Sequence, residues 1–431
     1  MGEAFQGLTV RGKGLLVVGV SLALLSLLLG EKDLLRVGLL AGLLPLLAAA
    51  VLARTRYRLI ATRVLDPVRV EVGQTARVTL RLRNASRVPT GTMMLEDSLP
   101  YSLGERPRLV LERLLGGGSS AVTYTVRADR RGKYDIGPLI VRITDPFGLI
   151  ELTRTYPSTD HLTATPRIVQ LPAVRLPGEY TGHGDNRSRA VAVHGDDDAA
   201  TREYRHGDDL RRVHWKSTAR VGELMVRREE QPWDSRAVIT MDLRSAGYRG
   251  DGPASSFEWS VEATAAVAAH LQMSGYKLRM VSEAVDLTPE TAVQANILDH
   301  LAEVGTRRTA SMDALVERIK RGDRGGLVIG VFGMMSVQEA ARLATLRTSG
   351  TTCIAVLVDS STWMSLPESA RHEADEAFND TVLTLMRGGW RVLQIRHNEP
   401  LEHQWHSLAH GSQGFSRRAA LAETISGGPR R

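Results

Sequence analysis

Two long apolar stretches near the amino terminus constrain this chain more than any other feature. The first reads GLLVVGVSLALLSLLLG (residues 14–30), the second reads LLRVGLLAGLLPLLAAAVLA (residues 34–53), and only EKD separates them. A membrane-spanning helix needs about 20 mostly apolar residues, with about 17 as the lower limit. The sequence therefore predicts a helical hairpin that crosses a membrane twice and anchors the chain through residues 1–56. A cleaved signal peptide is the alternative for the first stretch, but no clear small-residue cleavage site follows it.

Basic residues around this hairpin predict its orientation. Arg11 and Lys13 precede it, and a cluster of arginines follows it: Arg54, Arg56, Arg58 and Arg63. The short turn carries two acids and one lysine. Because Lys and Arg accumulate on the cytoplasmic side of membrane spans, both ends of the hairpin should be cytoplasmic. We therefore expect a two-span protein of the inner cell membrane, with its soluble domains in the cytoplasm.

Composition narrows the classes of function. The chain has 431 residues, of which 43% are hydrophobic, so it can bury more than one core and should form two or three domains. Lys and Arg exceed Asp and Glu by 55 to 48, and this modest excess next to apolar spans favours a membrane-facing surface. Nucleic-acid binding is not expected, because no basic helix stands out and only 5% of the residues are aromatic. The single cysteine, Cys353, excludes an intrachain disulfide and is expected to be a small core residue.

Residues 57–170 alternate between apolar and polar positions, which predicts a β-sandwich of six to eight strands. One stretch, ARVTLRLRN, places its apolar and polar side chains on opposite faces. Turn-forming residues separate the strands. The sequence DPFGL should form such a turn, carried by Asp145 and Gly148, with Phe147 pointing inward.

Residues 233–400 alternate apolar strands with amphipathic helices, and this pattern predicts a doubly wound parallel α/β sheet. Ligands of such sheets bind beyond the carboxyl ends of the strands. Asp242 and Asp359 each follow a predicted strand, so they are the natural candidates for binding any metal ion. Residues 401–431 are expected to form a flexible basic tail.

A connecting segment, residues 171–232, contains the densely charged stretch EYRHGDDLRRVHWKSTARVGELMVRREEQ (residues 203–231). The acidic pair that begins at Asp208 suits a helix amino terminus. We expect a short helix that starts there, turns Trp215 inward and ends near Ala219. A strand should follow this helix.

Three roles of this stretch are open from the residues alone. The first is a brace at the junction of two domains, because Arg binds carboxylates with fixed geometry. The members of that brace would be Arg205, Asp208, Arg212, His214 and Arg220. The second role is a partner-binding surface. The third is catalysis by His206 or His214 together with Ser217, although no Gly-x-Ser-x-Gly turn accompanies these residues.

The α/β region resembles a von Willebrand factor A domain, whose metal site is built on Asp-x-Ser-x-Ser after the first strand. The matching positions here are Asp242, Arg244 and Ala246, so both hydroxyl ligands are missing. A divalent cation such as Mg²⁺ needs an oxygen-rich shell. The resemblance therefore implies that the Arg244 guanidinium takes the place of the cation.

Most of the chain resembles the bacterial family named domain of unknown function 58. The resemblance rests on VEVGQTARVTLRLRNASRVP, on RRGKYDIGPLIVRITDPFGLI and above all on REYRHGDDLRRVHWKSTARVGELMVRREEQ. It implies a membrane-tethered partner of a MoxR-type AAA+ ATPase, with a transglutaminase-like membrane protein as a further partner. The motif residues that would serve as docking or structural positions are Tyr204, Arg205, Gly207, Asp208, Arg212, His214, Trp215, Ala219 and Arg220.

These features together predict a non-catalytic scaffold or adaptor without a cofactor, acting in the assembly or remodelling of envelope-associated complexes. The chain has no Walker-type Gly-Lys-Ser/Thr loop, so ATP hydrolysis should belong to the partner. The alternative is a metal-dependent or hydrolytic enzyme that uses Asp242 and Asp359. A surface adhesion module is a third possibility, and it requires the bulk of the chain to lie outside the cell.

Overall fold

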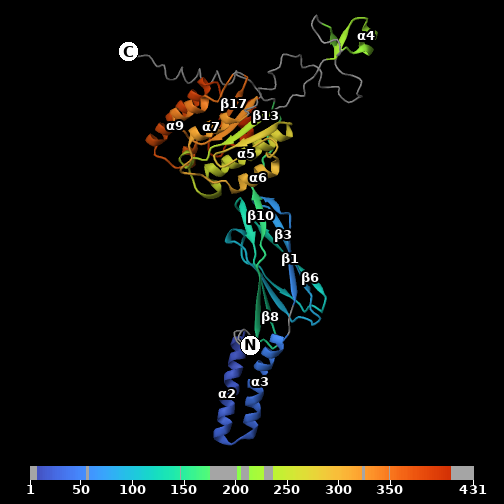
Figure 1. Ribbon diagram of the computed structural model, residues 1–431. Helices are drawn as coiled ribbons and strands as arrows, with labels where there is room; N and C mark the ends of the chain where they lie inside the picture. The colour runs from blue at the N-terminus through green and yellow to red at the C-terminus, as the bar shows by residue number, and fades with distance from the viewer. Residues whose placement is uncertain are drawn as a thin grey trace. The chain divides into compact units, whose positions relative to one another are not determined.

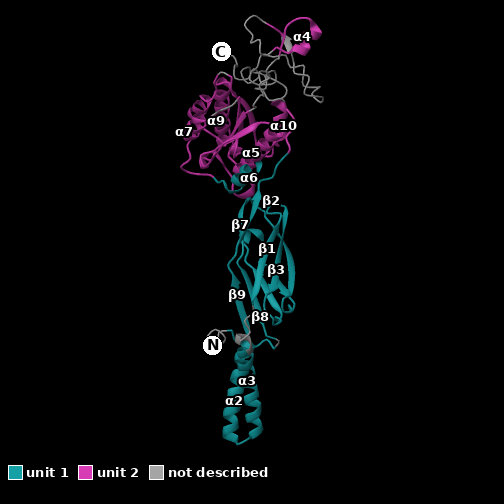
Figure 2. Ribbon diagram, turned by 45° about the vertical axis from the view of Figure 1, so that its right-hand side comes forward, with its two compact units in different colours: residues 1–169, 294–305 teal, residues 170–293, 306–431 magenta. Residues whose placement is uncertain are grey.

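The computed structural model describes residues 7–54, 58–145, 147–174, 201–204, 213–227, 236–322, 326–348 and 350–408. The chain divides into two compact units (Figure 2). Unit 1 comprises residues 1–169 together with 294–305, and unit 2 comprises residues 170–293 together with 306–431.

Unit 1 begins with two helices, α2 (Val10–Leu29) and α3 (Lys32–Arg54), which run side by side as a hairpin (Figure 1). Both are long and apolar enough to cross a membrane. Gly30, at φ +72°, ends α2 in the left-handed conformation that glycine adopts without strain. Gly19 lies at the contact between the helices, where an added Cβ atom would come within 2.5 Å of the Gly42 nitrogen. Small residues at this position therefore allow the two backbones to approach closely.

After this hairpin, the described residues of unit 1 form ten β-strands, arranged in three sheets. The first sheet has the order β1 (Leu59–Asp66), β3 (Thr75–Asn84), β6 (Ser119–Arg127) and is antiparallel. The second has the order β2 (Arg69–Glu71), β10 (Asp160–Thr165), β7 (Gly132–Ile136). The third has the order β5 (Arg108–Leu111), β4 (Met93–Asp97), β8 (Leu139–Thr144), β9 (Glu151–Tyr156).

The first sheet supplies one side of two separate apolar cores. Strand β3 alternates between buried and exposed or half-buried residues, as its sequence predicts, and Leu80 and Leu82 share a core with Met93 of the third sheet. Val78 lies further along the same face and shares a second core with Leu162 of the second sheet. The β region is therefore a two-layer structure in which one long sheet backs two shorter sheets.

Helix α6 (Gln294–Glu303) belongs to unit 1, although the sequence placed residues 233–400 in a single domain. Arg69 of β2 binds the carboxylate of Asp299 with two hydrogen bonds of 2.8 and 2.7 Å. Arg131 donates to the carbonyl oxygens of Leu301 and Ala302 at the end of the helix, where a cation is favoured by the helix dipole. These contacts join residues far apart in the sequence, which is why the local pattern did not predict them.

Unit 2 contains a six-stranded sheet of order β15-β14-β13-β16-β17-β18. Five strands are parallel, namely β13 (Arg236–Met241), β14 (Lys277–Val281), β16 (Leu327–Phe332), β17 (Thr352–Val358) and β18 (Arg391–Ile395). The edge strand β15 (Asp286–Leu287) is antiparallel to β14. The predicted parallel α/β sheet is thus present. Each of its parallel strands is formed by one of the mostly apolar runs of the sequence.

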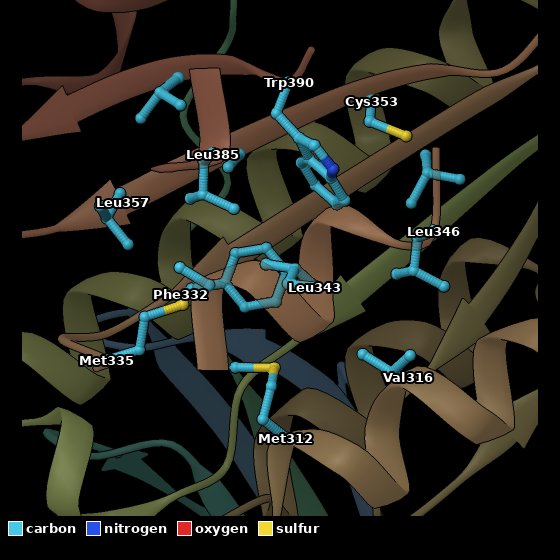
Figure 3. Close-up of a cluster of buried hydrophobic side chains, with 14 of the residues drawn as sticks. Met312, Val316, Phe332, Met335, Leu343, Leu346, Cys353, Leu357, Leu385 and Trp390 are labelled. Atoms are coloured by element: carbon cyan, nitrogen blue, oxygen red, sulfur yellow. The ribbon is translucent and has the colours of Figure 1, made fainter. Parts of the chain in front are cut away.

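The longer helices of unit 2 cover this sheet. They are α5 (Ser256–Met273), α7 (Met312–Arg321), α8 (Val337–Ala344) and α9 (Glu368–Arg387). Helices α7, α8 and α9 bury their apolar sides in one core around Phe332 and Trp390, whose rings meet edge to face at 6.2 Å (Figure 3). Cys353 lies in this core with 1% of its surface exposed, as expected for a small apolar residue.

The predicted start of the flexible tail at residue 401 was too early. Helix α10 (Leu401–Ser407) follows β18, and its Trp405 is fully buried. The Trp405 ring meets the ring of His270 from α5 edge to face at 5.4 Å. This burial requires a long-range contact, so the sequence pattern alone missed it. The remainder of the predicted tail, from residue 409, lies outside the described residues.

The turn at residues 145–149 is present, but its aromatic residue points the other way. The Asp145 carboxylate accepts hydrogen bonds from the backbone N–H groups of Phe147 and Ile150, and Gly148 has φ +70°. Phe147 is 66% exposed, which corrects the prediction that it points inward. Leu149 and Ile150 fill the core at this position instead.

Candidate functional site

The charged stretch is described in part. Residues Arg205, Gly207, Asp208 and Arg212 of the predicted motif lie outside the described residues, so the predicted brace is not visible. The described motif residues are Tyr204, His214, Trp215, Ala219 and Arg220. They belong to a small element of unit 2 made of β11 (Thr201–Glu203), α4 (Trp215–Val221) and β12 (Met225–Arg227).

Helix α4 begins later than its sequence suggested. Val213, which was expected inside the helix, pairs as a β-bridge with Val226, and both side chains are buried. His214 then caps the helix, because its Nδ1 atom accepts the backbone N–H of Ser217 at 3.3 Å. Gly222, at φ +83°, ends the helix. Helix α4 thus begins only after Val213, because this β-branched residue pairs with Val226 as part of a β-bridge.

Trp215 is 70% exposed, which corrects the prediction that it faces inward. Lys216, Ala219 and Arg220 on the same helix are also exposed. Val221, the last residue of the helix, is 57% exposed. The described part of the motif therefore presents a large aromatic side chain beside two cations.

The pairing of His214 with Ser217 has a structural explanation. The Ser217 hydroxyl lies 2.8 Å from His214 Nδ1, the same atom that accepts the Ser217 backbone N–H. A nucleophile and base pair would need the histidine held by a third group at its other ring nitrogen. The geometry observed is that of a helix cap, in which a side chain satisfies a backbone donor of the first turn.

Asp242 follows β13 at the carboxyl end of the sheet and is 1% exposed. Both of its carboxylate oxygens accept hydrogen bonds from the Arg244 guanidinium, at 3.0 Å from Nε and 2.8 Å from Nη2. The Arg244 backbone N–H adds a third bond, at 2.9 Å. The Arg244 guanidinium therefore neutralises the carboxylate of Asp242, the residue that the resemblance assigned to a metal ion.

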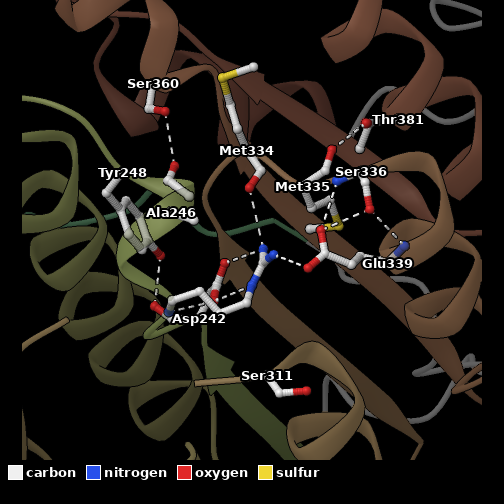
Figure 4. Close-up of polar contacts among 12 residues, drawn as sticks. Asp242, Ala246, Tyr248, Ser311, Met334, Met335, Ser336, Glu339, Ser360 and Thr381 are labelled. Carbon is white, nitrogen blue, oxygen red and sulfur yellow. Dashed lines mark hydrogen bonds and ion pairs between the residues drawn. The ribbon is translucent and has the colours of Figure 1, made fainter. Parts of the chain in front are cut away.

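Glu339 completes this buried cluster from the other side (Figure 4). Its Oε1 atom accepts from Arg244 Nη1 at 2.5 Å, while Oε2 accepts from the backbone N–H and the hydroxyl of Ser336. Burial alone would lower the pKa of Arg244, but the charges and hydrogen bonds of Asp242 and Glu339 raise it above its ordinary value. Arg244 thus stays charged and ties the loop after β13 to the first turn of α8.

Asp359 follows β17 and is fully buried. Its Oδ1 atom accepts from the Ser361 hydroxyl at 2.5 Å, and its Oδ2 atom lies 3.9 Å from Arg396 Nε. Oδ2 has no hydrogen-bond partner. Burial raises the pKa of this carboxyl above its ordinary value.

The two predicted metal candidates do not form one site. Strand β16 lies between β13 and β17, so two steps of about 4.8 Å separate the strands that carry them. Asp242 is bound by Arg244, and Asp359 is bound by Ser361. Among the residues that the structure describes, no group of three or more His, Cys, Asp and Glu side chains could hold a metal ion.

Replacing Asp359 by asparagine is expected to change the pH dependence of the stability of unit 2. Because the folded pKa of Asp359 is raised, this carboxyl stabilises the fold when protonated, and that contribution is lost as pH rises through the raised value. The stability of Asp359→Asn relative to the natural protein should therefore increase between about pH 4 and pH 7. Urea unfolding followed by tryptophan emission measures this difference. The exposed Asp380 provides the control variant, Asp380→Asn, and a pH-independent difference for Asp359→Asn would contradict the prediction.

A buried polar cluster in unit 1 escaped the sequence analysis. Arg63 of β1 binds both oxygens of Asp97 in β4, at 2.6 and 3.0 Å, and its third nitrogen binds Asp160 in β10 at 2.9 Å. The Tyr124 hydroxyl of β6 donates to Asp97 at 2.6 Å. Arg63 and Asp97 side chains are 2% and 0% exposed. This cluster joins all three sheets, so Arg63 is a structural residue as well as one of the arginines that follow the hairpin.

Comparison with known proteins shows that part of the chain is similar in sequence to an uncharacterised protein. It is 27% identical over 213 residues to the uncharacterized protein YeaD of Bacillus subtilis (strain 168), and the match covers 48% of this chain and 51% of that protein. The chain thus spans about half the length of this curated relative.

Two solved structures are similar to part of the chain, with low TM-scores. The CARDB domain of the PF1109 protein from Pyrococcus furiosus is 11% identical, with 26% of this chain and 90% of that chain covered and a TM-score of 0.20. AT1g01470 from Arabidopsis thaliana is 12% identical, with 27% and 87% covered and a TM-score of 0.20. A family model gives the more specific result: the model described as Protein of unknown function DUF58 matches residues 200–398, from the charged element through the last strand of the unit 2 sheet.

Proposed function

We propose that the protein is a non-catalytic, membrane-anchored scaffold or adaptor that docks a MoxR-type AAA+ ATPase. It would act in the assembly or remodelling of envelope-associated complexes, with a transglutaminase-like membrane protein as a further partner. The DUF58 match over residues 200–398 supports this proposal, because it covers the motif that carries the resemblance. The docking surface in this proposal is the charged element around α4.

The observation that carries the proposal is the exposure of Trp215. A tryptophan that is 70% exposed leaves a large apolar surface in water, and such residues supply much of the binding free energy when a partner buries them. Lys216 and Arg220 on the same helix are exposed cations. A partner that fits this surface has an apolar pocket for the indole ring and acidic side chains around it.

The remaining features support an anchored binding protein. Helices α2 and α3 would hold the chain in the inner membrane, and the basic residues on both sides of the hairpin would keep the soluble units cytoplasmic. The parallel sheet of unit 2, with Asp242 directly after its first strand β13, supports the resemblance to a von Willebrand factor A domain. Because Arg244 neutralises Asp242, the proposal needs no metal ion at that position.

The competing proposal is a metal-dependent or hydrolytic enzyme that uses Asp242 and Asp359. One observation favours it: the buried Oδ2 atom of Asp359 has no hydrogen-bond partner. Tight Mg²⁺ or Mn²⁺ binding by the purified protein, abolished by Asp242→Ala, would support the enzyme and oppose the adaptor.

Replacing Trp215 by alanine should weaken capture of the ATPase by about 30-fold, which corresponds to about 2 kcal/mol. The measurement is the dissociation constant of the purified ATPase for the full-length protein in detergent. Tyr101→Ala is the matched control, because Tyr101 is an aromatic residue of unit 1 that is 98% exposed. Equal dissociation constants for the natural protein and Trp215→Ala would show that α4 is not the docking surface.

A further inference from the structure

The helical hairpin meets one end of the β region of unit 1. Ala49, near the end of α3, and Leu59, at the start of β1, belong to one apolar core. At the start of α2, the hydroxyl and the backbone N–H of Thr9 donate to the carbonyl oxygens of Gly148 and Leu149, at 2.7 and 2.9 Å. The hairpin is thus fixed to this end of the β region through both of its helices.

Strand pairing brings three loops to this same end of the β region. Strand β1 starts beside the end of β3, where Leu59 pairs with Asn84. Strand β6 starts beside the same end of β3, and β8 ends beside the start of β4. The loops at residues 85–92 and 112–118 and the turn at residues 145–149 therefore lie together at the end that carries the hairpin.

Polar side chains fix the conformation of all three loops. Asn84 is fully buried, and its side chain donates to the carbonyl oxygens of Val88 and Leu115, so it ties the first loop to the second. In the turn, the Asp145 carboxylate accepts the backbone N–H of Phe147 at 3.1 Å. The side chains at the tips of these loops are therefore held in place without being buried.

Each of the three loops presents a large apolar side chain to solvent. Val88 is 49% exposed, Leu115 is 67% exposed and Phe147 is 66% exposed. A single exposed apolar residue is common on a folded protein and needs no explanation. Here one stands on each of three neighbouring loops, directly beside two apolar helices. Such a grouping points to a contact with an apolar environment outside the protein.

The length of α3 sets the level of these loops relative to a membrane. A helix of 23 residues is about 35 Å long, and the hydrocarbon core of a bilayer is about 30 Å thick. Ala49 lies in the last two turns of α3 and already packs in the core of the β region. A hairpin that spans the bilayer therefore places the three loops at the boundary between acyl chains and headgroups. Apolar side chains are stabilised by insertion at this boundary.

We propose that this end of the β region is a lipid-contact surface, with Val88, Leu115 and Phe147 inserted at the boundary between headgroups and acyl chains. The inference rests on the membrane anchor of the proposed function and is independent of the docking of an ATPase. It gives unit 1 a second attachment to the bilayer, because the β region contacts lipid directly as well as through the hairpin.

Spin labels on the full-length protein in vesicles test this surface. The vesicles contain equal parts of phosphatidylcholine and phosphatidylglycerol. Val88→Cys, Leu115→Cys and Phe147→Cys are labelled separately, and the natural protein is the blank because its Cys353 is 1% exposed. Oxygen concentrates among the acyl chains and a nickel chelate stays in water. The ratio of the two collision rates therefore reports the depth of each label.

Two further positions calibrate this measurement. Tyr101→Cys is the matched control, because Tyr101 is 98% exposed and lies two residues from Leu103, which packs in the other apolar core of unit 1. Val20→Cys, in the middle of α2, reports insertion of the hairpin itself. We expect oxygen-to-nickel ratios at the three loop positions that are at least about threefold above Tyr101→Cys and below Val20→Cys.

Three results would overturn the lipid contact, and they differ in what they leave standing. Loop ratios equal to that of Tyr101→Cys, with a high ratio at Val20→Cys, would exclude the lipid contact and leave the membrane anchor intact. A low ratio at Val20→Cys as well would exclude the anchor and the lipid contact together. Low collision rates with both reagents at the loop positions would indicate a protein contact, such as a second copy of the chain, in place of lipid.

Discussion

Replacing Arg244 by alanine is expected to lower the free energy of unfolding of unit 2 by about 3–5 kcal/mol. The variant leaves Asp242 buried without its cation, and it also removes a hydrogen bond from Glu339. Removing one partner of a buried ion pair is costly because the other charge stays in a medium of low polarity. Unfolding in urea, followed by tryptophan emission, measures the change. All six tryptophans of the chain lie in the residues of unit 2, so this signal reports that unit alone.

Two variants serve as controls for this result. Asp242→Asn combined with Arg244→Met removes both charges and should recover a large part of the lost stability, since a neutral pair leaves no buried ion. Arg371→Ala removes an exposed arginine of α9 and should change stability by less than about 0.5 kcal/mol. If Arg244→Ala and Arg371→Ala had the same free energy of unfolding, the ion pair between Arg244 and Asp242 would not stabilise the protein in solution.

The second large effect is expected in unit 1. Arg63→Ala should destabilise the β region by about 3–5 kcal/mol, because Asp97 would remain buried with only the Tyr124 hydroxyl beside it. Arg63 also binds Asp160 of β10, so the substitution weakens the contact among all three sheets. Hydrogen exchange of peptides from β3, β4 and β10 measures the change, and tryptophan emission should stay unaffected.

Two further substitutions test whether the effect of Arg63→Ala comes from the loss of the buried cluster. Arg63→Lys keeps the charge but loses the bidentate geometry, so its effect should be intermediate. Arg81→Ala removes an exposed arginine of β3 in the same sheet and should leave hydrogen exchange nearly unchanged. Equal exchange rates for Arg63→Ala and Arg81→Ala would show that the buried cluster does not stabilise the three sheets.

Elements that depend on local patterns could be predicted from the sequence. The apolar runs that became β13, β16 and β17 are buried throughout most of their length, as central parallel strands should be. The alternation of β3 likewise determined which of its side chains face the core. Asp242 and Arg244 are two residues apart, so their interaction could also be anticipated from the sequence.

Features that depend on distant partners could not be predicted in this way. Arg63 meets Asp97 and Asp160 across 34 and 97 residues, and Glu339 meets Arg244 across 95. Trp405 was assigned to a mobile tail because its burial beside α5 requires the folded sheet. Each of these contacts arises from packing between elements, and periodicity within one element carries no information about it.

Trp215 is the reverse case, because the sequence predicted that it is buried and the structure shows that it is exposed. Its position after Val213 suggested the apolar side of a helix, but Val213 pairs with a strand and the helix begins only at Trp215. The indole ring is then left in solvent. This exposure is the main reason for treating the charged element as a binding surface.

The most direct test of the adaptor proposal is binding of a purified MoxR-type ATPase to the purified full-length protein in detergent with EDTA present. The account predicts saturable binding that EDTA does not weaken, together with no turnover of any small molecule by the protein alone. Binding that is absent in repeated titrations, accompanied by metal-dependent turnover that Asp242→Ala abolishes, would contradict it.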